Sequence, residues 1–131
     1  MTINPRTPVI IGISQISYPA PQLDTPLDAI DIMSEAVSAA VADTGGSGVV
    51  EAIDTLAVVA GLFSFRDPAA LIAAEIGAPK ARTVLTSMGG NTPITFTGEL
   101  GDRIWRGEAD IAVLVSGESN ATRRALKRQG R

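Results

Sequence analysis

Two short segments of this chain hold the polar residues and glycines that are the best candidates for chemistry. One is the run SMGGNTP at residues 87–93, and the other is the run SGES at residues 116–119. Each follows an apolar run that predicts a strand, and each precedes a segment expected to be helical. In α/β proteins such a junction places helix N-terminal amides at the carboxyl ends of strands, where ligands tend to bind. We therefore expect any functional site at one of these junctions.

The second junction imitates the nucleophile elbow of hydrolases, in which a strand, a Gly-x-Ser-x-small sequence and a helix follow one another, with Ser119 in the place of the nucleophile. A serine of that type needs a histidine as its base, and the chain contains no histidine. We favour the alternative, in which Ser119 is a polar residue at a strand end that caps the following helix.

The chain also contains no cysteine. The two absences together remove disulfides, thiolate nucleophiles, and the commonest general base and metal ligand. We expect no metal site and no bound cofactor. The length of 131 residues, with 45% hydrophobic and 19% charged residues, is typical of a single soluble domain. No apolar run approaches the length that spans a membrane and the N-terminus does not resemble a leader, so we expect a cytoplasmic protein.

The charge of the chain is unevenly distributed. Its formal net charge is −3, yet five of its eleven basic residues lie after Thr122, which leaves six basic against fourteen acidic residues before them. These five are Arg123, Arg124, Lys127, Arg128 and Arg131. They could hold the phosphates of a ligand, although a solvated helix face is the favoured interpretation. Nucleic-acid binding is disfavoured because the rest of the chain is acidic and poor in aromatic residues.

Strand and helix patterns alternate along the sequence. Apolar runs predict strands at residues 8–16, 53–60, 83–87 and 110–116. Helices are predicted from Pro26, after an N-cap at Thr25, to just before Gly45, and at residues 69–76, 92–105 and 120–128. The β-branched residues 94–97 leave a strand as the competing interpretation of the start of the third helix.

This alternation predicts an α/β fold with a mainly parallel sheet of about four strands and helices on both faces. Gly12, inside the first predicted strand, predicts a bulge or a close approach by another backbone. The chain has neither the glycine fingerprint of dinucleotide-binding folds nor a Gly-Lys-Ser/Thr phosphate loop, so nucleotide binding would rest on architecture alone.

Several segments together resemble the N-terminal half of the thiolase superfamily, in particular the sterol-carrier-protein type and acetyl-CoA acetyltransferase-like relatives. The resemblance is carried by residues 8–12 (PVIIG), by the helix at residues 28–41, and above all by residues 105–119, from WRGEADI through GES. It covers nearly all of this chain but only the first part of the family's length. It implies that residues 1–131 form a truncated N-terminal thiolase-like domain.

Counting back from Asp110, the resemblance places the acyl-accepting cysteine of the family near Gly90, so it implies no catalytic residue in this chain. The resemblance still leaves a role for the turn formed by Met88, Gly89, Gly90 and Asn91. Because its two glycines have no side chains, backbone amides could come close to an acyl carbonyl or carboxylate. A tight turn between strand and helix that has no ligand explains the same glycines equally well.

The function implied is that of a thiolase-like acyltransferase of lipid metabolism, or another acyl-CoA-handling protein, that lacks the nucleophilic cysteine. On its own the chain is expected to be inactive, with acyl-CoA as substrate and not as cofactor. The alternative is a non-catalytic dimerisation or assembly module of thiolase-like fold. Expected partners are a second copy or the missing C-terminal half, with no nucleic acid and no membrane span.

Overall fold

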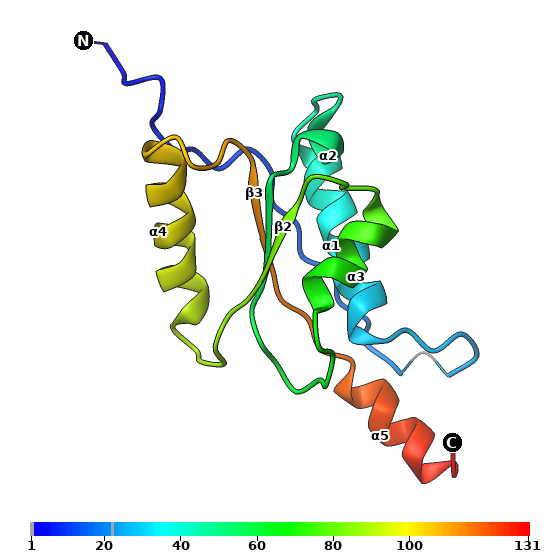
Figure 1. Ribbon diagram of the computed structural model, residues 1–131. Coiled ribbons are helices and arrows are strands. Elements are labelled where there is room, and N and C mark those ends of the chain that lie inside the picture. Colours follow the sequence, from blue (N-terminus) through cyan, green and yellow to red (C-terminus); the bar gives the residue numbers. More distant parts are fainter. Residues whose placement is uncertain (1, 22) are drawn as a thin grey trace.

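The computed structural model describes residues 2–21 and 23–131, and it is built around a three-stranded parallel sheet (Figure 1). The strands are β1 (Thr55–Val58), β2 (Arg82–Leu85) and β3 (Ala112–Val115). Their spatial order is β2-β1-β3, and both outer strands run parallel to β1. The predicted α/β class with a parallel sheet is confirmed.

Helices cover both faces of this sheet. They are α1 (Ala29–Asp43), the single-turn α2 (Val49–Ala52), α3 (Pro68–Ile76), α4 (Thr92–Trp105) and α5 (Asn120–Arg128). The helices α1 and α3 pack together on one face, α4 stands on the other, and α5 extends away from the end of β3 (Figure 1). No element was predicted from the sequence for the residues that form α2.

The core is centred on β1, which is buried along its whole length. Thr55 lies opposite Arg82 of β2 and Ala112 of β3, so both edges of β1 are paired. The largest fully buried side chains come from β1, α1, α3 and the residue that follows α2, and they include Met33, Val37, Ile53, Leu56, Val58 and Ile72. The continuous apolar run of β1 is therefore explained by burial on both faces.

The first helix begins later than the sequence predicted. Asp28, and not Thr25, is the N-cap of α1. The Asp28 Oδ1 atom accepts from the Asp31 amide at 2.9 Å, and the Asp31 Oδ2 atom accepts from the Asp28 amide at 2.8 Å. This reciprocal capping box satisfies two amides at once, and it places the first turn of the helix after Asp28.

Residues 8–16 do not form the predicted first strand, so the sheet has three strands where about four were expected. The segment lies on α1 instead. The Ile13 amide donates to Asp43 Oδ2 at 2.9 Å, and the Ser14 hydroxyl donates to the Ala36 carbonyl at 2.6 Å. A Cβ atom at Gly12 would stand 2.2 Å from the Ala40 carbonyl oxygen, so the predicted close backbone approach at Gly12 is confirmed.

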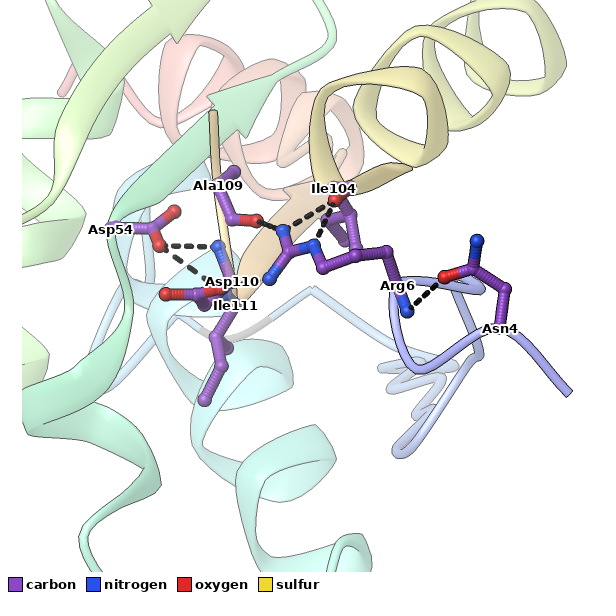
Figure 2. A network of polar contacts seen from close by, with 7 residues as sticks. All are labelled: Asn4, Arg6, Asp54, Ile104, Ala109, Asp110 and Ile111. Carbon is purple, nitrogen blue, oxygen red and sulfur yellow. Dashed lines mark hydrogen bonds and ion pairs between the residues drawn. The ribbon is translucent and has the colours of Figure 1, made fainter. Parts of the chain in front are cut away.

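Arg6 ties the N-terminal segment to residues 104–110, where α4 ends and the connection to β3 follows (Figure 2). Its guanidinium donates to the carbonyls of Ile104, at the end of α4, and of Ala109, and it pairs with the Asp110 carboxylate at 2.7 Å. The Asp110 amide in turn donates to Asp54 Oδ2 at 2.6 Å, next to the start of β1. These contacts of Arg6 and Asp110 thus fix the position at which residues 8–16 begin relative to β3.

Tyr18 is also held against α1, since its hydroxyl donates a hydrogen bond to the Glu35 carboxylate. This bond, with smaller effects from desolvation and the charge of Glu35, raises the pKa of Tyr18 above its ordinary value of 10.0. Because the folded-state pKa lies above the unfolded one, the contact stabilises the fold below about pH 10 and is lost as the pH rises through the folded-state pKa.

We expect the ultraviolet absorbance of the only tyrosine to titrate with a midpoint above 10.0. The Glu35→Gln variant removes the carboxylate that accepts the Tyr18 hydrogen bond, together with its negative charge, so its midpoint should return toward the ordinary value. Glu75→Gln, which changes an exposed carboxylate on α3, is the matched control and should leave the midpoint unchanged. Equal midpoints for all three proteins would contradict the Tyr18 contact.

Candidate functional site

The two junctions predicted to hold chemistry lie at the carboxyl edge of the sheet. Residues 86–91 lead from β2 into α4, and residues 116–119 lead from β3 into α5. The loop at residues 59–67, between β1 and α3, starts at the same edge because all three strands are parallel. The structure therefore brings three connecting segments to one edge, where α/β folds commonly bind ligands.

The turn of Met88, Gly89, Gly90 and Asn91 forms the entry to α4. The Thr92 amide donates to the Gly89 carbonyl at 3.2 Å, and Asn91 is the N-cap of the helix. The side chain of Asn91 makes no capping hydrogen bond. Met88 is 60% exposed, so the turn presents an apolar side chain and a helix N-terminus to solvent.

The two glycines of this turn are not required by backbone conformation. Neither is among the glycines with positive φ. A Cβ atom at Gly90 would meet nothing within 4 Å, whereas one at Gly89 would stand 2.9 Å from Thr92 Oγ1. Gly90 is exposed, so a side chain there would project into open space. Of the two explanations given above, a tight turn that needs glycine therefore does not account for Gly90.

A cavity of about 310 Å³ lies beside this turn, between the end of β2 and the first turns of α4. It is lined by Thr86, Ser87, Asn91, Thr92, Thr95, Phe96 and Glu99. Asn91 is the one predicted turn residue that lines it. The sequence did not single out Thr95 or Phe96 as site residues. The signal that could have found them is helical spacing, since Thr95 lies four residues after Asn91 and Phe96 four residues after Thr92.

At the second junction, Glu118 and Arg123 bind the neighbouring loop. The Glu118 carboxylate accepts from the Leu62 amide at 3.0 Å and from Asn120 Nδ2 at 2.7 Å. Arg123 Nη1 donates to the Leu62 carbonyl at 2.7 Å. Both backbone polar groups of Leu62 are thus bound, which fixes the loop after β1 beside the start of α5.

Ser119 is 8% exposed, so little of it is open to a substrate. It is the N-cap residue of α5, as predicted, but its side chain makes no capping hydrogen bond. Arg124, Lys127 and Arg128 are exposed, which agrees with the solvated interpretation of the basic run.

Within residues 2–21 and 23–131, no group of three or more acidic residues is placed to hold a metal ion. No helix in that part of the chain is both long enough and apolar enough to cross a membrane.

Solved structures with the same arrangement of elements identify the fold. A monomeric SCP2-thiolase like protein type 1 from Mycobacterium smegmatis superposes with a TM-score of 0.73, at 30% sequence identity over 88% of this chain. This chain has a thiolase-like fold. OleA from Xanthomonas campestris, also of the thiolase superfamily, superposes with a TM-score of 0.68 at 20% identity over 85% of the chain, in a structure with bound lauric acid and lauroyl-CoA.

The thiolase-like unit spans 24% of the Mycobacterium smegmatis protein and 34% of that OleA chain. The predicted resemblance to the first part of the superfamily is therefore confirmed at the level of the fold. Neither a protein-family model nor a curated protein matches the sequence. The acyl-binding role of residues 88–91 and the correspondence of Gly90 to the family's cysteine stay predictions.

The open surroundings of Gly90 make a test of its conformation simple. Gly90→Ala should raise the free energy of unfolding by about 0.4–1 kcal/mol, because alanine restricts the unfolded chain at no steric cost here. Gly77→Ala is the matched control, since Gly77 ends α3 with a φ of 79° and alanine there should cost about 1–2 kcal/mol. Urea denaturation measures both values. A loss at Gly90 equal to that at Gly77 would mean that the turn does need glycine.

Proposed function

We propose that this chain is the N-terminal portion of a thiolase-like, acyl-CoA-handling protein in which the cysteine-dependent step is absent. The observation that carries the proposal is a thiolase-like fold whose junction between β2 and α4 holds an exposed glycine that its backbone does not require. Because Gly90 has no side chain and no atom crowds it, a ligand can approach the backbone there closely.

The chemistry available at the turn is binding without covalent attachment. Amides at the N-terminus of α4 and the positive end of its dipole favour an acyl carbonyl oxygen or a carboxylate. Phe96, which lines the cavity beside Asn91, supplies apolar surface for the first carbons of an acyl chain, and the exposed Met88 belongs to the adjacent turn. OleA, which shares the fold, has been solved with lauroyl-CoA, which supports acyl-CoA as the ligand class.

No residue of this segment replaces the family's nucleophile. The chain contains no cysteine and no histidine, and Ser119 is buried at a helix start. Any reaction of a longer protein would proceed without an acyl-cysteine on this segment, by acid and base groups from elsewhere. This segment would position the acyl group and orient its carbonyl.

The absence of cysteine allows a direct test, because Gly90→Cys would introduce a single thiol into open space at the turn. The ligand is S-dodecyl-CoA, a thioether that cannot transfer an acyl group to the thiol. We expect it to slow alkylation of this thiol by iodoacetamide about tenfold at ten times its dissociation constant, since only the free fraction reacts.

Gly98→Cys is the control, because Gly98 is also exposed with nothing within 4 Å of a Cβ atom but lies farther along α4. Its alkylation rate should not change with the ligand. Slowing at residue 90 alone supports the proposal. Unchanged rates at both positions, or equal slowing at both, would refute an acyl-CoA site at the turn.

The alternative function, a non-catalytic assembly module, rests on the free edge of β2. Within the described residues β2 pairs with β1 alone, and Leu85 at its end is 43% exposed. Exposed apolar strand edges favour pairing between molecules. The similar protein from Mycobacterium smegmatis, by contrast, is described as monomeric.

Sedimentation velocity at micromolar concentration separates the two functions. The assembly function predicts a dimer that Leu85→Lys converts to a monomer, because a charge on an edge strand opposes pairing. Leu62→Lys, an equally drastic change at an exposed leucine outside β2, should leave that dimer intact. A monomeric unmodified chain would rule out self-assembly through this edge.

A further inference from the structure

The cavity beside the turn of residues 88–91 has a polar wall. It measures about 310 Å³, which is at the small end of the range for ligand sites in proteins. Six of the seven described residues that line it carry a hydroxyl, an amide or a carboxylate, and the seventh is Phe96. Most small-molecule sites are instead lined mainly by apolar and aromatic side chains. A plain hydrocarbon chain is therefore a poor match to this wall.

Two polar groups of the wall lie next to each other on α4. Thr95 and Glu99 are four residues apart, so their side chains are neighbours on the helix surface. Side chains on a helix lean toward its N-terminus, which brings the Glu99 carboxylate over the turn that holds Thr95. That turn lies four residues, or about 6 Å along the helix axis, beyond Asn91. The cavity thus extends from the amides of the first helical turn to the pair of Thr95 and Glu99.

Neither member of this pair is bound within the described part of the protein. Neither ion pair of residues 2–21 and 23–131 includes the Glu99 carboxylate, and neither this carboxylate nor the Thr95 hydroxyl has a hydrogen-bond partner there. By contrast, the Thr97 hydroxyl donates to the Pro93 carbonyl at 2.7 Å. Thr95 and Glu99 are exposed, so both can bind water. A ligand that displaces this water has to replace its hydrogen bonds.

We propose that this cavity selects a short acyl group that carries a hydroxyl near its far end. The inference rests on the proposed function, in which the turn of residues 88–91 binds the acyl carbonyl. With the carbonyl at the amides of the first turn, a hydroxyl about 6 Å farther along α4 reaches Thr95 and Glu99. This hydroxyl donates a hydrogen bond to the Glu99 carboxylate and accepts one from the Thr95 hydroxyl. Phe96 contacts the carbons between the two polar ends.

Other ends of the acyl group fit this pair less well. A methyl end would cover the Glu99 carboxylate and the Thr95 hydroxyl without replacing their hydrogen bonds to water. A carboxylate end would be repelled by the charge of Glu99. An ammonium end would exchange strong hydration for one exposed carboxylate, and such surface ion pairs contribute little. Because sites that bind a substrate hydroxyl discriminate against the analogue that lacks it, this pair sets specificity within the acyl-CoA class.

Two CoA thioethers whose arms are of equal size test this selection. S-(4-hydroxybutyl)-CoA and S-pentyl-CoA differ only in having a hydroxyl or a methyl group at the end of the arm. Both lack the carbonyl oxygen, so any loss of affinity from its absence is the same for the two. Isothermal titration calorimetry of the 131-residue chain should give a dissociation constant about tenfold lower for the hydroxylated arm. Equal dissociation constants would overturn the inference and leave the proposed function standing.

Two substitutions test which groups carry the preference for the hydroxylated arm. Glu99→Ala and Thr95→Val should each reduce it to about threefold or less, because each removes one of the two hydrogen bonds. The matched controls, Glu75→Ala on α3 and Thr97→Val on α4, change residues outside this cavity and should preserve it. An undiminished preference in both cavity variants would overturn the inference. Failure of both thioethers to bind the unmodified chain would overturn it together with the proposed function.

Discussion

The burial of β1 on both faces and both edges is the constraint on which the rest of this molecule depends. Leu56, Ala57 and Val58 are fully buried, so helices must cover both faces of the strand. The helices α1 and α3 do so closely on one side through Met33 and Ile72. On the other side α4 contributes only one buried residue, Leu100. The two faces of the sheet are therefore covered unequally, and α4 itself leaves Ile94 and Trp105 exposed.

Local patterns in the sequence predicted most of this architecture because most of it is decided locally. The proline and capping aspartate at the start of α3 and the helical spacing through Trp105 in α4 were sufficient for those helices. The predicted start of α1 was wrong. Two acceptable caps lie three residues apart, and the structure uses the one stabilised by the reciprocal contact between Asp28 and Asp31. The prediction of a strand at residues 8–16 was also wrong, because a β-branched run does not reveal whether a partner strand is present.

The sequence predicted the position of the turn before α4 more successfully than its geometry. Glycines between a strand and a helix indicated the turn before α4, but not that Gly90 stands in open space with an ordinary backbone. The Arg6 contacts could not have been found from the sequence. They join residues about one hundred positions apart, and no local spacing encodes such a pair. Likewise, no local pattern indicated that Glu118 binds the loop at Leu62, which lies 56 residues away in the sequence.

The order of the strands also determines how the sheet is completed during synthesis. The central strand β1 leaves the ribosome before either neighbour, and β2 can pair with it through the short α3 crossover. The other edge of β1 stays bare until α4 and β3 have been translated. Through that interval a nascent chain displays the apolar run at residues 55–58 with one side unpaired, which is the kind of surface that chaperones bind. A strand at the centre of a sheet but early in the chain therefore leaves one of its edges unpaired until the last strand has been made.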